Sequence, residues 1–302
     1  MAKKYLIIGA GAVGTFYGSK LSQAGDQIII WSRNDSEIIA KNGYKIKSYM
    51  GDYDFNPYLV IKNLHDLRED IDFIIVSTKV LPDIDIVDLI SKVIKKNIAI
   101  IIIQNGIHIE KNIADKFSSN QIISALAFIG VSRTNPNEIN HQEYGKLIFG
   151  NYNNIDSIAI NYFAKSLEKS GLEILLSSNI LSERWKKLIW NGAFNPLSVV
   201  LGKKNTQQIL ENNLAIDLAK NIMQEIVMLA KHDGCKFEND IIDKNILATK
   251  KMLPYKTSML LDFEANRPME IQAIIGNAVK FAQSKSLSIP YLSTIYAIIS
   301  NL

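Results

Sequence analysis

Three polar side chains recur at four-residue intervals in a segment that is otherwise rich in apolar residues. They are Lys187, Asn191 and Asn195. This spacing places them on one face of a helix, where they could line a buried polar pocket or form a solvated stripe beside Lys186. A lysine and two amides in such a pocket could bind a polar ligand, since buried amides need hydrogen-bond partners. Pro196 lacks a backbone N–H and is expected to kink or end this helix next to Asn195.

Two further polar residues, Ser258 and Glu270, lie in a later segment. Pro268 fits the first turn of a new helix, which would place Glu270 two residues into it. Both side chains are therefore candidate site residues. The alternative is that Glu270 serves the helix dipole or a capping arrangement, and that Ser258 is only a local cap.

A glycine-rich loop near the start of the chain directly follows the apolar run 5–8 and directly precedes a helical pattern. It reads Gly9-Ala10-Gly11-Ala12-Val13-Gly14. In such a loop the first glycine permits the tight turn, the second lets the backbone approach a pyrophosphate, and the third lets the helix pack on the strand. The pyrophosphate would lie at the positive end of the helix that begins near Val13. The strand and helix on either side disfavour a glycine turn without a ligand.

The residues after the second apolar run bear on which dinucleotide is bound. Arg33 can pair with a phosphate through two N–H groups, and Ser32 can add a hydroxyl. Asp35 is the objection, because an acidic side chain in this region would bind the ribose 2′-hydroxyl of NAD. On balance these residues favour NADP over NAD.

Two more expected strand ends carry polar residues, Lys79 and Asn105. Both follow buried runs whose carboxyl ends meet at the ligand-binding edge of a doubly wound sheet. Lys79 could reach a cofactor phosphate, and the Asn105 amide could bind nicotinamide or substrate. Since both residue types are common in loops, neither establishes a site alone.

The first half of the chain alternates short aliphatic runs with amphipathic stretches, which predicts an α/β fold with a doubly wound sheet of the Rossmann type. Strands are expected over 5–8, 27–31, 73–76, 98–103, 122–127, 138–140, 146–149 and 172–176, with a hairpin over 43–61 that turns at Gly51-Asp52. Helices are expected over 15–24, 83–95 and 156–170. Strand patterns stop near Ser178, so we expect an NADP-binding domain over 1–178 and an all-α substrate and catalytic domain over 179–302. One helix there should present Leu218, Ile222, Ile226 and Leu229 on its apolar face and end near Gly234.

Composition excludes several classes of protein. The 302 residues are 47% hydrophobic and 21% charged, with a net charge of +4 and no long basic run, so neither disorder nor nucleic-acid binding is indicated. A lone cysteine, Cys235, excludes an intramolecular disulfide, and the four histidines show no metal-ligand spacing, so no metal is expected. Neither a signal peptide nor a membrane span is apparent, which indicates a cytoplasmic protein. The apolar C-terminal helices are compatible with a homodimer.

Taken in order, these motifs resemble those of the ketopantoate reductases, or 2-dehydropantoate 2-reductases. The resemblance covers essentially the whole chain, and its most specific part is the helix that carries Lys187, Asn191 and Asn195-Pro196. It implies NADPH-dependent reduction of the small-molecule substrate 2-dehydropantoate to pantoate, a step that supplies pantothenate and coenzyme A.

The resemblance also implies roles for individual residues. Lys187 matches the catalytic lysine that polarises and protonates the ketone, and Glu270 matches the acid of the catalytic site. Asn105 matches a residue at the nicotinamide and the substrate, and the basic positions at the cofactor are matched by Arg33 and Lys79. The substrate-binding positions are matched by Asn191, Asn195 and Ser258, and more loosely by Asn205.

Two other functions remain open from the sequence. One is a related NAD(P)-dependent dehydrogenase that acts on another 2-oxo or 3-hydroxy acid. The other is a redox-sensing NADP-binding module without activity, against which the presence of both Lys187 and Glu270 argues.

Overall fold

The aliphatic runs of the first half form the centre of a mixed sheet. The computed structural model describes residues 2–153, 155 and 158–302, and these form ten paired strands. Four central strands pair in parallel, and nearly all of their side chains are buried, as expected for strands covered on both faces. They are β1 (Lys4–Ile8), β2 (Gln27–Trp31), β6 (Phe73–Val76) and β7 (Ala99–Ile103).

The strand order is β4-β3-β9-β8-β7-β6-β1-β2-β5, and β10 (Ile174–Leu176) pairs with β9. From β8 to β5 every neighbouring pair is parallel. From β1 the chain adds β2 and β5 on one side of the sheet and then β6, β7 and β8 on the other, so the strand order switches between β1 and β6. This is the doubly wound order of the dinucleotide-binding folds, in which ligands bind at the carboxyl ends of the strands beside the reversal.

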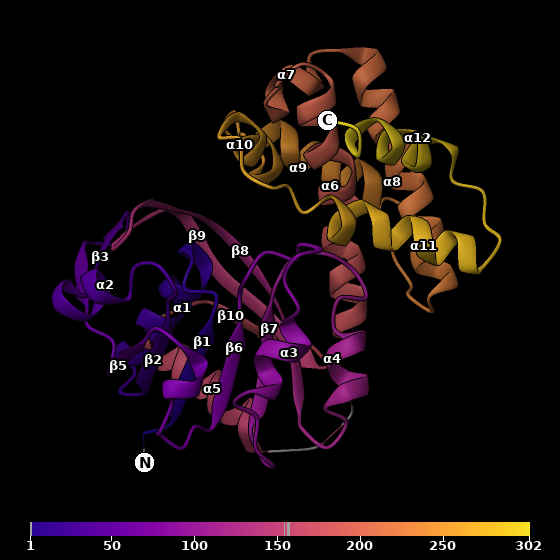
Figure 1. Cartoon of the computed structure of the whole chain (residues 1–302). Coiled ribbons are helices and arrows are strands. Elements are labelled where there is room, and N and C mark those ends of the chain that lie inside the picture. Colours follow the sequence, from indigo (N-terminus) through magenta and orange to yellow (C-terminus); the bar gives the residue numbers. More distant parts are fainter. Residues whose placement is uncertain (1, 154, 156–157) are drawn as a thin grey trace. The chain divides into compact units, whose positions relative to one another are not determined.

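Helices join the strands of this sheet (Figure 1). They are α1 (Ala12–Gln23), α2 (Ser36–Asn42), a 3₁₀ turn η1 (Leu64–Asp66), α3 (Ile86–Ser91), α4 (Lys111–Lys116) and α5 (Ile158–Lys169). Phe16 of α1 and Phe163 of α5 are fully buried in one core cluster with alternate residues of the central strands, including Tyr5. Residues 156–157, the expected start of the helix over 156–170, lie outside the described residues.

The tyrosine-rich insert forms the expected hairpin only in part. β3 (Tyr44–Ser48) and β4 (Tyr53–Phe55) pair antiparallel around Gly51, whose φ of 113° favours glycine. β5 (Leu59–Ile61) leaves the hairpin and pairs in parallel with β2 at the other end of the sheet. Pro57 stands between β4 and β5 and has no N–H to donate to a ladder, which agrees with the break.

A long antiparallel ribbon replaces the short strands expected after residue 122. β8 (Ile122–Asn135) and β9 (Glu138–Asn151) each have 14 residues. The sequence suggested an interruption at Tyr144-Gly145, and both residues have positive φ, but β9 continues through them. The register shifts between Phe128 and Ile129 of β8, which leaves Gly145 as an extra residue in β9 and keeps the two strands paired.

The second half of the chain is helical, with no strand among residues 181–302. Its elements are α6 (Ile180–Val200), α7 (Thr206–Leu210), α8 (Asn213–His232), α9 (Ile241–Lys251), α10 (Ser258–Glu264), the π-helical turn η2 (Gln272–Gly276), α11 (Asn277–Ser284) and α12 (Pro290–Ile299). As predicted, α8 buries Ile222, Ile226 and Leu229 and is followed by Gly234 at φ 84°, while Leu218 of the same face is partly buried against the core. Within the described residues, no helix is long and apolar enough to cross a bilayer.

Helix α6 does not end beside Asn195 and continues through Pro196 to Val200. Residues 192–199 are all buried, so tertiary packing holds the helix together despite the hydrogen bond that a proline removes. Of the two predicted outcomes at Pro196, a kink or an end of the helix, the end was therefore wrong.

The chain divides into two units, each with its own core. The first contains the residues up to Gln104 together with Glu110–Ile180, and the second contains Leu181–Leu302 together with the short segment Asn105–Ile109. Sequence patterns alone did not indicate that residues 105–109 belong to the helical unit.

Candidate active site

The glycine loop is fixed against the end of β6. A Cβ on Gly9 would lie 2.4 Å from the backbone nitrogen of Thr78, and one on Gly14 would lie 2.1 Å from Oγ of Ser77. Ser77 Oγ also donates a hydrogen bond of 2.8 Å to the carbonyl of Gly9. The first and third glycines are therefore required by close packing.

The second glycine of the loop faces open space. Apart from its chain neighbours, no described residue has an atom within 4 Å of the position that a Cβ on Gly11 would take. No side chain caps α1, which begins at Ala12 and carries no acidic residue in its first turn. The positive end of α1 and its first N–H groups can therefore receive an anion, so the loop fits the pyrophosphate of a dinucleotide.

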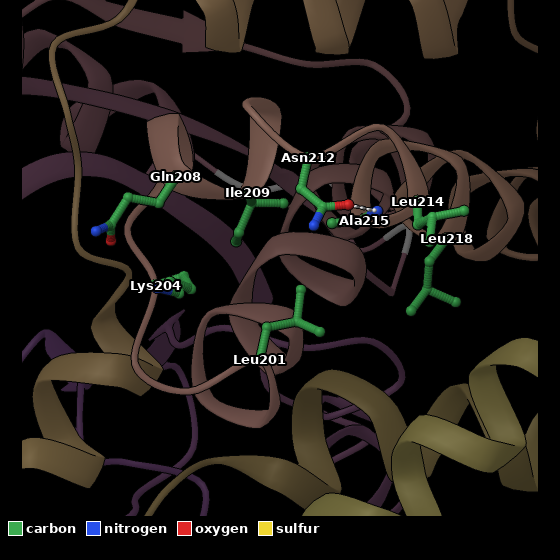
Figure 2. Close-up of a pocket in the computed structure, with 8 residues that line it drawn as sticks. All are labelled: Leu201, Lys204, Gln208, Ile209, Asn212, Leu214, Ala215 and Leu218. Carbon is green, nitrogen blue, oxygen red and sulfur yellow. Dashed lines mark hydrogen bonds between the residues drawn. The ribbon is translucent and has the colours of Figure 1, made fainter.

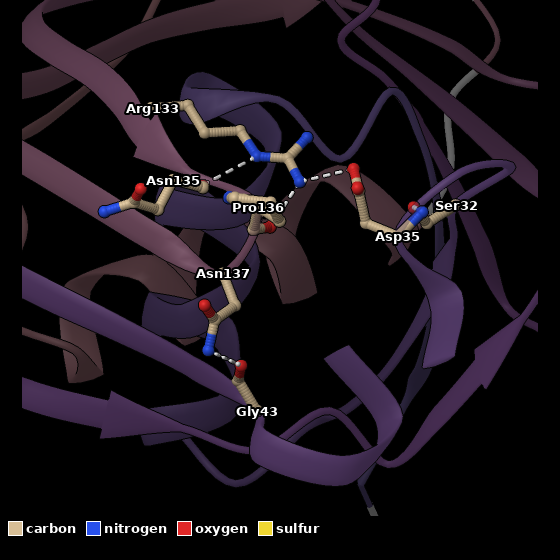
Figure 3. A network of polar contacts seen from close by, with 7 residues as sticks. All are labelled: Ser32, Asp35, Gly43, Arg133, Asn135, Pro136 and Asn137. Atoms are coloured by element: carbon tan, nitrogen blue, oxygen red, sulfur yellow. Dashed lines mark hydrogen bonds and ion pairs between the residues drawn. The ribbon is translucent and has the colours of Figure 1, made fainter. Parts of the chain in front are cut away.

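The segment after β2 carries one basic residue, Arg33, and one acidic residue, Asp35. Arg33 is exposed, and its guanidinium carbon lies 5.7 Å from the centroid of a Trp31 ring. Asp35, whose acidic side chain would favour NAD over NADP, forms an ion pair of 2.7 Å with Arg133 of β8 (Figure 3). Lys79 is half-buried three residues after β6.

In the helical unit, α6 carries the polar stripe expected from the sequence. Lys187 Nζ donates a hydrogen bond of 3.0 Å to Oδ1 of Asn105. Asn191 is half-buried, while Asn195 is only 2% exposed, so the stripe is not solvated at its C-terminal end. Among the described residues, the side-chain amide of Asn195 forms no hydrogen bond, which leaves a buried polar group able to bind a ligand.

The pKa of Lys187 is lowered to about 7. Burial is the main cause, because it disfavours the charged form, and the positive charge of Arg184 adds to it. The negative charge of Glu270 acts in the opposite direction and raises this pKa. An ammonium group with a pKa near neutrality is suited to donate a proton near neutral pH.

The segment that carries Asn105 is anchored to the helical unit by its backbone. Ile107 accepts a hydrogen bond of 2.8 Å from Asn277 Nδ2 and donates one of 3.2 Å to the carbonyl of Ala273. Gly106, at φ 108°, accepts a bond of 3.0 Å from Arg184, and a Cβ there would lie 2.5 Å from the Ala273 oxygen. These contacts hold the amide that binds Lys187.

The next residue of this segment is anchored by its side chain. Asp233 binds His108 Nε2 at 2.7 Å and accepts a bond of the same length from Trp185 Nε1. Sequence reasoning missed the anchoring residues Arg184, Asp233 and Asn277. Arg184 alone gave a signal, since it precedes Lys187 by three residues and so lies near it on the helix.

The other expected site residues of the helical unit take different places. Ser258 is the exposed first residue of α10 and does not cap it, because Thr257 Oγ1 accepts the capping bond from Leu260 at 3.1 Å. Asn205 caps α7, where its Oδ1 accepts a bond of 2.9 Å from Gln208. The helix expected to start at Pro268 starts at Ile271, so Glu270 directly precedes it.

A pocket of about 260 Å³ lies between α7 and α8 (Figure 2). Asn212, one of its lining residues, caps α8 by accepting a bond of 3.1 Å from Ala215. The pocket contains none of the residues expected at the active site. Among the described residues, no group of three or more histidine, cysteine or acidic side chains is placed to hold a metal ion.

Comparison with known proteins identifies the family. The family model described as "Ketopantoate reductase PanE/ApbA" matches residues 5–154, and its C-terminal counterpart matches residues 179–302. The chain belongs to the ketopantoate reductase family. Members of this family are oxidoreductases that act on CH–OH groups with NAD(P).

Two relatives named 2-dehydropantoate 2-reductase illustrate the similarity. The crystal structure of the Methylococcus capsulatus enzyme is 41% identical with a TM-score of 0.93, and the alignment covers 98% of this chain and 96% of that one. The Nostoc protein is 29% identical, with 97% and 93% of the two chains covered.

The fold also occurs in D-mandelate dehydrogenase, described in a ternary structure with NADH and anilino(oxo)acetate. The TM-score is 0.87 at 21% identity, covering 99% of this chain and 97% of the other. At this identity the likeness concerns the fold alone. The choice of substrate and dinucleotide therefore has to be argued from the residues of this ketopantoate reductase family member.

Proposed function

We propose that the protein reduces 2-dehydropantoate to pantoate with NADPH, the step that supplies pantothenate for coenzyme A. The observation that carries the proposal is the partly buried ammonium group of Lys187, held by Asn105 and with a pKa near 7. The relatives named 2-dehydropantoate 2-reductase support the choice of substrate.

The first domain, expected over residues 1–178 and without residues 105–109 in the structure, holds the dinucleotide. The pyrophosphate binds at the open face of Gly11 and the N-terminus of α1, and the basic residues Arg33 and Lys79 bind phosphate groups. Asn105 contributes to binding near the nicotinamide. The bound cofactor supplies the hydride.

Lys187 acts as the proton donor. Its ammonium group hydrogen-bonds the ketone oxygen, stabilises the negative charge that develops there, and transfers a proton to it. Asn105 orients the ammonium group without neutralising it, since an amide oxygen carries no net charge. Glu270 orients the substrate hydroxyl or the lysine and keeps the lysine protonated near neutral pH.

The helical domain, over residues 179–302, binds the substrate. Asn191 and Asn195 supply amides from α6, and Ser258 supplies a hydroxyl from the start of α10. These neutral groups bind the hydroxyl and carboxylate of the substrate through hydrogen bonds. Asn205 contributes only its amide nitrogen, because its oxygen already caps α7.

The experiment that tests the proposal is NADPH oxidation followed by absorbance, with 2-dehydropantoate, pyruvate and 2-oxoisovalerate as substrates, and with NADH in parallel. Rapid NADPH-preferring turnover of 2-dehydropantoate alone is the expected result. Turnover of another oxo acid in its place would assign the protein to the alternative, a related dehydrogenase. The fold shared with D-mandelate dehydrogenase is compatible with that alternative.

A cytoplasmic location and a homodimer complete the proposal. A Staphylococcus aureus ketopantoate reductase, 23% identical with a TM-score of 0.83, is described as dimeric. Light scattering of the purified protein should give twice the chain mass of 33.9 kDa, and the chain mass itself would contradict the dimer.

A further inference from the structure

Asp35 is in an unusual state for its position. It directly precedes α2, where an aspartate normally accepts a hydrogen bond from an N–H of the first helical turn. Its side chain makes no such bond. Instead, Oδ2 accepts a charge-assisted bond of 2.7 Å from Nη2 of Arg133, 98 residues further along the chain (Figure 3).

Arg133 is held in place for this contact. Its Nε donates to the carbonyl of Asn135 at 3.3 Å, and its Nη2 also donates to the carbonyl of Pro136. The same turn between β8 and β9 is tied to the other end of α2, because Asn137 Nδ2 donates a bond of 3.2 Å to the carbonyl of Gly43 (Figure 3). The guanidinium group is therefore fixed relative to α2.

The pair is partly shielded from solvent, since each side chain is 28% exposed. Tyr44, at the start of β3, is an electrostatic neighbour of both groups. Burial raises the pKa of its phenol, while the Thr15 hydroxyl and the Arg133 charge lower it and the Asp35 charge raises it. β1 and β2 pair in parallel with Ile8 opposite Trp31, so the glycine loop after β1 and the segment after β2 that carries Asp35 leave the sheet at the same edge.

In dinucleotide-binding folds, an acidic side chain after the second strand binds the ribose 2′-hydroxyl of NAD, and its charge repels the 2′-phosphate of NADP. We propose that Arg133 is a specificity-determining residue that suppresses this role of Asp35. By holding the carboxylate, Arg133 removes the acceptor for the 2′-hydroxyl and neutralises the charge that opposes the 2′-phosphate. This inference rests on the proposed use of NADPH.

The test is the binding of NADPH and NADH by fluorescence titration, which needs no oxo acid substrate. In Arg133→Gln the unpaired carboxylate should weaken NADPH binding and reduce the preference for NADPH over NADH by about tenfold. Asp35→Asn alone should change the preference by less than about twofold, because the carboxylate is already neutralised in the native protein. The double variant should recover most of the native preference, since it lacks both charges.

Arg68→Gln is the matched control, because it removes an exposed arginine from the same unit without touching Asp35. Thermal unfolding of each variant shows whether the fold is retained. Equal weakening of NADPH and NADH in Arg133→Gln, or no recovery in the double variant, would overturn the inference and leave the proposed function intact. A native protein that binds neither dinucleotide would overturn both.

Discussion

The Nζ atom of Lys187 lies 3.0 Å from Oδ1 of Asn105, a residue 82 positions earlier in the chain. Asn105 belongs to the short segment that the backbone contacts of Ile107 and Gly106 hold within the helical unit. The acceptor for the ammonium group is thus a neutral amide. Burial, to which the positive charge of Arg184 adds, lowers the pKa of Lys187 to about 7, while the charge of Glu270 raises it.

Replacing that amide by a carboxylate should reverse the effect. In Asn105→Asp, an opposite charge beside Lys187 raises the pKa of the ammonium group by about one unit or more. Since the protonated form is the proton donor, kcat/KM of the native protein should fall as the pH rises above about 7. In the variant this fall should begin at higher pH. A pH profile of kcat/KM is the measurement, with Asn105→Ala as the control that adds no charge, and an unchanged profile would contradict the assignment.

Removing the carboxylate of Glu270 should shift the same profile in the other direction. Glu270 raises the pKa of Lys187, so Glu270→Gln should lower it, and the loss of activity should begin at lower pH than in the native protein. Glu264→Gln is the control, because this residue pairs with Lys256 at 2.8 Å. An equal loss of activity at every pH would mean that Glu270 does not act through the charge of Lys187.

Asn195 should show a conflict between stability and binding. Asn195→Leu replaces a buried amide, which has no side-chain hydrogen bond among the described residues, by an apolar group of similar size. We expect Tm to stay the same or rise, while KM for the oxo acid rises by about tenfold or more.

The control for this experiment is Ser198→Ala, one helical turn further along α6. Ser198 Oγ lies 2.6 Å from the carbonyl of Asn195 and 2.7 Å from Oγ1 of Thr257. Its loss should lower stability by about 1 kcal/mol with little effect on KM. A lower Tm with an unchanged KM in Asn195→Leu would show that the amide is structural.

Gly14 and Gly11 of the loop should respond differently to replacement by alanine. In Gly14→Ala the new Cβ would lie 2.1 Å from Ser77 Oγ and 2.5 Å from the Gly9 carbonyl, so the protein should lose stability. In Gly11→Ala the Cβ meets no atom within 4 Å, so Tm should be unchanged while the affinity for NADPH falls by about tenfold or more. Thermal unfolding and NADPH titration of both variants measure this, and full NADPH affinity in Gly11→Ala would contradict the placement of the pyrophosphate.

Local pattern predicted much of the fold, because burial on both faces of a strand and on one face of a helix leaves a direct record in the sequence. The runs at β1 and β6 and the apolar stripe of α8 are examples. Properties that depend on distant partners were not predicted. β5 pairs with β2, at the other end of the sheet from the hairpin of β3 and β4 that precedes it in the chain. Pro196 is tolerated within α6 because its neighbours are buried.

The same distinction applies to the candidate site. The four-residue spacing in α6 is a local pattern, and it is enough to indicate Lys187 and Asn195 as candidate site residues. No local pattern links Asp35 to Arg133 or Asn277 to Ile107, since these partners meet only through the fold. Asn205 and Thr257 show that a local pattern can also be ambiguous. Such side chains can either cap a helix or contact a ligand, and only the structure shows that these two cap α7 and α10.

The most direct test of the account is the rate of NADPH oxidation with 2-dehydropantoate in Lys187→Met, compared with the native protein and with Lys186→Met. Methionine keeps the length of the side chain and removes its charge, and Lys186 is an exposed neighbour on the same helix. We expect kcat to fall by about 10² to 10⁴-fold in Lys187→Met, with NADPH affinity retained, and to be unchanged in Lys186→Met. Turnover in Lys187→Met within about twofold of the native rate would contradict the central claim that this ammonium group protonates the ketone.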